Sequence, residues 1–186
     1  LHDALPILQQ GASVSGRVFL DRNNNGDQDG TGAPQDAGLN NVTLTLTGTD
    51  VYGNPVNLTA TTNAQGDYSF DNLPPSDAAG YTITQDQTTV LADYNNGVPQ
   101  PNTPRANRNG VSTGVTPAAG GYSVSNTATT SVIAGVVVTS GGQGVQFDFP
   151  EINLRSLSGY VFADNDPDDV YVPGVTDTPI AGATLE

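Results

Sequence analysis

The chain has 186 residues, and its 19 acidic side chains against 5 arginines give a formal net charge of −14. Nucleic acid and anionic membranes would repel so acidic a surface, so neither is expected as a partner. The chain has neither cysteine nor lysine. Disulfide bonds and thiolate metal sites are therefore excluded, and no apolar run approaches the ~20 residues of a membrane-spanning helix. The same acidity suits a calcium-rich extracellular setting, a salt-adapted protein or simply a soluble surface.

We expect residues 1–10, LHDALPILQQ, to be a disordered or non-native lead. They contain the only histidine, His2. Without cysteine, lysine or a placed histidine, the usual activated nucleophiles are missing. Paired carboxylates could serve a glycosidase, but the acids of this chain lie in turns for which a metal offers another explanation. The sequence therefore predicts that the protein is not an enzyme.

The segment LDRNNNGDQDG, residues 20–30, places an oxygen-bearing side chain at every second position. These residues are Asp21, Asn23, Asn25, Asp27 and Asp29. The spacing fits the start of a calcium loop, because Ca²⁺ takes about 6–8 oxygen ligands and short Asp and Asn side chains at alternate positions converge as the chain curls around the ion. Gly26 permits the sharp turn. Asp27 would offer its backbone carbonyl, Asp29 a direct or water-mediated contact, and the other three their side chains.

This loop is not an EF-hand. Its twelfth position is Gly32, where an EF-hand has glutamate, and its flanks VSGRVFL and NNVTLTL alternate as strands. Asp36 is the expected closing carboxylate once the insertion GTGA is allowed. An Asx-rich turn without metal remains the alternative, because such turns favour the same residue types.

Alternation with period two dominates the rest of the chain and predicts half-buried strands. The inward positions are Val42, Leu44 and Leu46, then Tyr68 and Phe70, then Tyr81 and Ile83, then Val145, Phe147 and Phe149. Turn signals stand at 63–67, 72–77 and 140–144, and no helical periodicity is found. Short strands at this spacing predict an all-β fold, an antiparallel β-sandwich.

Residues 91–121 carry few apolar side chains and much Gly, Pro and Asn. We interpret them as a long surface loop within the sandwich, because residues 122–150 supply the closing strands. A linker between two small domains is the alternative.

An internal repeat divides the chain. Residues 13–30 return as 156–173, displaced by 143 residues, and 36–44 return as 177–185. The repeat predicts tandem domains, with one complete unit at 11–153 and the truncated start of a second at 154–186. The second copy keeps the oxygens at Asp164, Asp166, Asp168 and Asp177. Because this copy cannot close its own sheet, we expect weak stabilisation beyond about residue 155.

These segments together resemble the SdrD B-like domain, the B-type repeat of bacterial serine-aspartate repeat surface proteins. The loop at 20–30 and the hairpin residues Gly66, Tyr68, Phe70 and Leu73 carry the resemblance. It implies a prealbumin-like or immunoglobulin-like sandwich in a tandem surface stalk stiffened by calcium. The ligands it implies are Asp21, Asn23, Asn25, Asp27, Asp29 and Asp36. Related B-type domains of collagen adhesins and pili can carry a Lys–Asn cross-link, which a chain without lysine cannot form.

The sequence thus leads to the hypothesis of a calcium-stabilised stalk or spacer repeat, with Ca²⁺ as its cofactor, in an adhesin-like protein that is secreted or on the bacterial cell surface. Its partners would be neighbouring repeats, and any host or matrix ligand would bind elsewhere in the parent protein. The alternative is a ligand- or carbohydrate-binding module of a surface adhesin or secreted enzyme. Tyr94 and Tyr122, which border the 91–121 segment, are the aromatic candidates for that role.

Overall fold

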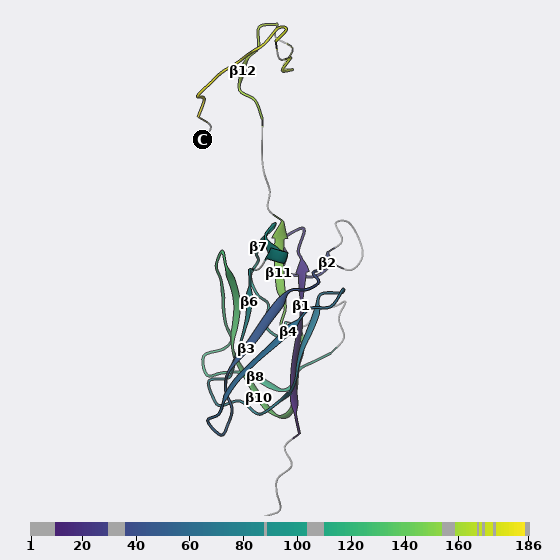
Figure 1. Ribbon diagram of the computed structural model, residues 1–186, viewed down its shortest axis with the longest axis vertical. Coiled ribbons are helices and arrows are strands. Elements are labelled where there is room, and N and C mark those ends of the chain that lie inside the picture. Colours follow the sequence, from purple (N-terminus) through teal and green to yellow (C-terminus); the bar gives the residue numbers. More distant parts are fainter. Residues whose placement is uncertain are drawn as a thin grey trace, which may run out of the picture. The chain divides into compact units, whose positions relative to one another are not determined.

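The computed structural model describes residues 10–29, 36–87, 89–103, 110–153, 159–166, 168, 170–172 and 174–184. The chain divides into two compact units, Leu1–Leu154 and Arg155–Glu186 (Figure 1). The predicted lead at 1–10 lies, except for Gln10, outside the described residues. In the described ranges, no helix is long and apolar enough to cross a membrane.

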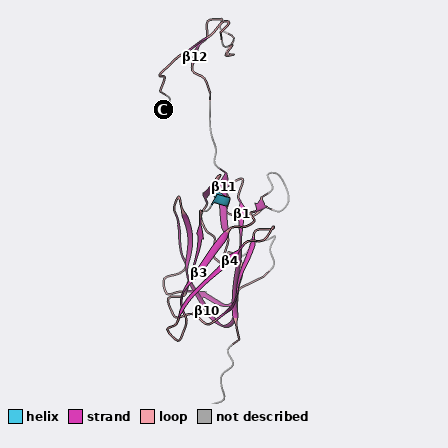
Figure 2. Ribbon diagram, viewed as in Figure 1, coloured by secondary structure: helices cyan, strands magenta, loops and turns pink. Residues whose placement is uncertain are grey.

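Strands make up nearly all of the regular secondary structure described in the first unit, and loops connect them (Figure 2). They are β1 (Ala12–Leu20), β2 (Ala37–Gly38), β3 (Thr43–Thr49), β4 (Pro55–Thr61), β5 (Asp67–Leu73), β6 (Tyr81–Asp86), β7 (Tyr94–Asn96), β8 (Thr113–Pro117), β9 (Ser123–Asn126), β10 (Thr130–Gly144) and β11 (Phe149–Asn153). The one helical turn in the described residues of this unit is the 3₁₀ turn η1 (Thr89–Leu91). The strands pair in the order β4-β3-β6-β10-β1-β11-β7, with β2 and β5 added on β1 and with β8 and β9 added on β10.

The sheet is mixed, so the prediction of a purely antiparallel sandwich is wrong on this point. Strand β1 pairs in parallel with β10, at Ser13↔Gln143, and with β11, at Val18↔Phe149. The neighbouring β1–β5 and β3–β4 pairs are antiparallel. Side chains alternate in the same way along parallel and antiparallel strands, so the residue pattern does not encode the direction of a partner strand.

One hydrophobic core lies between the strands, and the predicted inward positions fill it except Val145, which is half-buried and outside the core cluster. Leu44 and Leu46 of β3 are fully buried, while the threonines that alternate with them are exposed or half-buried. Ile83 of β6 and Phe70 of β5 join the same cluster. Each fully buried aliphatic or Phe side chain contributes about 1.5–3 kcal/mol, so this alternation is sufficient to specify which face of each strand points inward.

The 91–121 segment is not one long loop, and this prediction is wrong. Strand β7 lies inside it and pairs with β11, and β8 lies inside it and pairs with β10 at Val138↔Val115. Leu91 is fully buried and Val115 is 6% exposed. Strands β7 and β8 have three and five residues and together place one side chain in the core cluster, so they are too short to show a hydrophobic period in the sequence. Residues 104–109 lie outside the described residues.

The predicted turn at 140–144 is also wrong, because β10 continues through it to Gly144. The strand carries register shifts between Val138 and Gln143, and Gly141 adopts φ +70° while its N–H donates to the Gln10 carbonyl at 2.9 Å. A β-bulge favours glycine just as a turn does, so the glycine-rich sequence does not distinguish the two. The predicted strand at 145–149 begins only at Phe149.

Candidate metal-binding loop

The segment at 21–29 leaves the end of β1, and its first acid is held tightly. Asp21 is fully buried, and its backbone N–H donates to the carbonyl of Glu151 on β11 at 2.7 Å. Its carboxylate accepts the backbone N–H groups of Asn25, at 3.1 Å, and Gly26, at 2.7 Å. Gly26 has φ +77°, the left-handed backbone region in which glycine is favoured. The chain therefore curls around the Asp21 carboxylate.

Asp36 reaches both ends of this loop. Its Oδ1 accepts the N–H of Arg22 at 2.9 Å, and its Oδ2 accepts the N–H of Asp29 at 2.8 Å. Its own N–H donates to the Asp29 carbonyl at 3.2 Å. Asp36 thus lies at the position expected of a closing acid, although it follows the loop by seven residues.

The remaining loop side chains bind one another. Asp29 Oδ2 accepts the side-chain amides of Asn23, at 2.8 Å, and Asn25, at 3.2 Å. Asn25 Oδ1 accepts the N–H of Asp27 at 2.7 Å. The loop also borders a cavity of about 280 Å³, which Asp21, Asn25, Gln100 and Pro150 help to line.

The donor types of this loop suit a hard cation, although the carboxylate oxygens of Asp21, Asp29 and Asp36 do not form a group within 4.8 Å of one another. Three carboxylates, from Asp21, Asp29 and Asp36, lie in one loop together with the amide oxygens of Asn23 and Asn25. All are oxygen ligands of the kind that Ca²⁺ prefers. The loop's own N–H and amide groups now satisfy these oxygens, so a bound cation would take over part of that role.

The second unit repeats the arrangement on a smaller scale. Strands β12 (Phe162–Ala163) and β13 (Thr178–Pro179) pair at Phe162↔Pro179, as β1 and β2 pair at Phe19↔Gly38. Asp177 is 4% exposed, and it accepts the N–H of Asn165 at 3.3 Å and the N–H of Val172 at 2.8 Å. These two donors lie 143 residues after Arg22 and Asp29, the donors to Asp36. The closing acid of each copy therefore makes the same pair of bonds.

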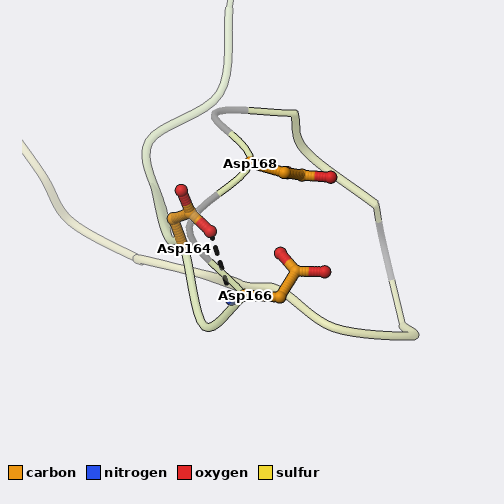
Figure 3. A group of neighbouring side chains, drawn as sticks. All are labelled: Asp164, Asp166 and Asp168. Atoms are coloured by element: carbon orange, nitrogen blue, oxygen red, sulfur yellow. Dashed lines mark hydrogen bonds between the residues drawn. The ribbon is translucent and has the colours of Figure 1, made fainter.

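Three carboxylates gather inside the second loop (Figure 3). Oxygens of Asp164, Asp166 and Asp168 all lie within 4.8 Å of one another, the one such group found among the described residues. Asp164 Oδ1 accepts the Asp166 N–H at 3.2 Å. Desolvation, and then the negative charge of Asp168, raise the pKa of Asp166. A cation bound here would relieve this crowding of like charges.

Sequence reasoning missed Arg17, which connects the loop to the sheet. Its backbone N–H donates to Asp148 Oδ1 at 2.8 Å, and its Nε donates to Asp67 Oδ1 at 2.6 Å. Its Nη1 donates to Gln28 of the loop. Asp67 and Asp148 are 50 and 131 residues away from Arg17, so no local sequence pattern predicts these contacts.

Glu151 was also missed. It is fully buried on β11, and both of its carboxyl oxygens lack a hydrogen-bond partner within the described residues. Burial raises the pKa of Glu151 to about 8, against the opposing effect of the neighbouring Gln85 and Gln87 side chains. The available signal was its place in FPEIN, where it stands two residues after Phe149, at an inward position of the strand.

The two tyrosines proposed for ligand binding do not form an exposed platform. Tyr94 and Tyr122 are half-buried and pack against the core, and the Tyr122 ring meets Phe147 edge to face at 5.7 Å. Burial also raises the pKa of Tyr122. This placement weighs against the carbohydrate-binding alternative.

Fold and site together define an all-β module with an acid- and amide-rich loop after its first strand. The family model of the SdrD B-like domain matches residues 12–113, more than half of the chain, and the chain belongs to this family. The match begins with β1 and includes the loop and the Gly66 hairpin. A search of curated proteins finds no match. SdrD B-like domains are structural, adhesin-type domains and occur in bacterial surface proteins.

Proposed function

We propose that this protein is a calcium-stabilised stalk or spacer repeat of an adhesin-like protein, exposed on a bacterial cell surface or secreted. Family membership supports the stalk or spacer role. The observation that supports the metal is the repeated closing acid, since Asp36 and Asp177 each bridge the two ends of an oxygen-rich loop. Neighbouring repeats are the proposed partners, and a host or matrix ligand would bind elsewhere in the parent protein.

The place of the loop explains how a cation would stiffen the domain. The loop continues β1, which pairs with β5, β10 and β11, and the Asp21–Glu151 bond ties it to β11, the last strand of the first unit. Calcium at Asp21 would neutralise the carboxylates of Asp29 and Asp36 and fix the loop to two strands at once. Sites in extracellular modules typically bind with Kd of about 10⁻⁴–10⁻³ M.

Calorimetric titration with calcium tests the proposal. We expect saturable binding that is lost from the first unit in Asp21→Ala and Asp36→Ala. Asp93→Ala is the matched control, because Asp93 is an exposed acid outside the loop. Binding unchanged by both loop variants would refute the assignment of this site.

Because the second unit has its own acidic group, the titration also includes Asp166→Ala. That variant should remove a separate binding step and leave the step that depends on Asp21. A single step insensitive to all loop substitutions would refute calcium binding at both copies.

A further inference from the structure

The loop contains one of the chain's three Asn–Gly pairs, Asn25–Gly26, and the others are Asn96–Gly97 and Asn109–Gly110. In such a pair the backbone nitrogen of glycine can attack the asparagine side-chain carbonyl, because glycine has no Cβ to obstruct the approach. The first two pairs lie wholly within the described residues, so their surroundings can be compared.

At Asn25–Gly26, the attacking nitrogen and the attacked carbonyl each have a partner suited to the reaction. The nucleophile, the Gly26 N–H, donates to the Asp21 carboxylate at 2.7 Å. The carbonyl oxygen that would gain negative charge, Asn25 Oδ1, accepts the Asp27 N–H at 2.7 Å. The leaving group, Asn25 Nδ2, donates to the Asp29 carboxylate at 3.2 Å. A base and an oxyanion donor thus lie beside one exposed side chain.

Asn96–Gly97 has the same two letters in an arrangement that opposes the reaction. Asn96 belongs to β7, its Nδ2 donates to the Thr127 carbonyl at 2.7 Å, and its Oδ1 accepts the Gln85 amide at 3.4 Å. The buried Gly97 N–H donates to the Pro150 carbonyl at 2.8 Å, and a peptide carbonyl is no base. The polar atoms of the Asn96 side chain bond to residues of other segments, so this pair provides an internal control.

We propose that Asn25 is a site of self-modification, at which the loop converts its own asparagine into an acid. The Gly26 nitrogen bonds to Asn25 Cγ and its proton passes to Asp21. Solvent returns a proton to Nδ2, because the Asn25 side chain is exposed, and the Cγ–Nδ2 bond then breaks with loss of ammonia. Water opens the resulting cyclic imide to aspartate or isoaspartate at position 25. The aspartate adds a negative charge beside Asp21 and Asp29. The isoaspartate lengthens the backbone and so removes the turn in which the Asp27 N–H donates to the side chain of residue 25.

A bound cation would slow this reaction, because it would draw Asp21 away from the Gly26 N–H. This clause alone rests on the proposed calcium function. The modification itself is expected in EDTA, in the metal-free protein.

Peptide mapping by mass spectrometry tests the proposal. The folded chain and the urea-unfolded chain are incubated in EDTA in ¹⁸O-labelled water at mildly alkaline pH, and conversion at Asn25 and Asn96 is followed. We expect Asn25 in the folded chain to convert about tenfold or more faster than Asn96, and at least as fast as in the unfolded chain. In Asp21→Asn the conversion at Asn25 should slow while Asn96 is unchanged.

Slower conversion of Asn25 in the folded than in the unfolded chain would overturn the proposal, and this comparison needs no variant to fold. A parallel incubation in calcium separates the two hypotheses. If calcium leaves the rate at Asn25 unchanged while the EDTA results hold, the modification site stands and the calcium function at this loop fails.

Discussion

Glu151 allows a prediction about pH that follows from burial alone. Its side chain is fully buried on β11 without a hydrogen-bond partner for either carboxyl oxygen in the described structure. Burial raises its pKa from 4.5 to about 8. A carboxyl whose pKa is raised by folding binds its proton more tightly in the folded state. Its full contribution to stability is therefore present below pH 4.5, and it is lost as the pH rises through about 8.

The size of the effect follows from the same two pKa values. The difference between 4.5 and about 8 corresponds to roughly 5 kcal/mol, at about 1.4 kcal/mol for each pKa unit. Rearrangement of the neighbouring Gln85 and Gln87 amides would reduce the loss. We therefore expect the free energy of unfolding to fall by about 2–5 kcal/mol across this pH range.

Urea unfolding of the wild type and of Glu151→Gln, both in EDTA, measures this loss. The variant keeps the shape of a neutral carboxyl but cannot ionise. The free energy of unfolding of the variant should lack the pH-dependent loss that Glu151 causes. The variant should therefore gain stability relative to the wild type as the pH rises. Parallel pH profiles would refute the reasoning, because they would show that Glu151 has the same pKa folded and unfolded.

Two further predictions concern the sheet, and each has a matched control. Gly66→Ala should destabilise the domain by more than about 2 kcal/mol, since a Cβ there would lie 2.2 Å from the Val18 carbonyl oxygen at φ +80°. Gly53→Ala, at φ +86° with nothing within 4 Å, should cost only about 1–2 kcal/mol, and equal losses in thermal unfolding would contradict the steric argument. Leu46→Ala should lower the free energy of unfolding by about 2–5 kcal/mol, because Leu46 is fully buried. The same substitution of its cross-strand partner Leu58, which is 39% exposed, should cost much less. Urea unfolding that ranks the two variants in reverse would contradict the placement of the core.

Much of the sheet could be predicted because single strands carry their own signal. Leu44 and Leu46 alternate with threonine over a whole strand, and Gly66 is required where the chain passes a carbonyl of β1. Strand direction is different: the parallel Val18↔Phe149 pair joins segments 131 residues apart, and nothing in either segment encodes it. Strands β7 and β8 form by pairing with β11 and β10, so they depend on tertiary contacts and not on their own residue pattern.

The candidate loop could be predicted for a related reason. Its oxygen-bearing side chains lie within nine consecutive residues, and Asp36, seven residues beyond, hydrogen-bonds to the backbone at both ends of the loop. The spacing predicts this loop but not convergence of its carboxylates, which do not form a group within 4.8 Å of one another. Arg17 and Glu151 could not be found in this way. The first depends on partners from β5 and from the segment before β11, and the second depends on how completely the sandwich buries one strand position.

Thermal unfolding of the wild-type chain in calcium and in EDTA is the decisive test of the proposal that calcium stabilises this fold. At about a hundredfold excess over Kd, a cation that binds only the folded state adds about 2.7 kcal/mol, which for a domain of this size raises the Tm by about 5–10 °C. We expect a rise of this order that saturates with calcium, is reversed by EDTA and is absent when magnesium replaces calcium at equal ionic strength. A melt that is the same in calcium and in EDTA would contradict the proposal.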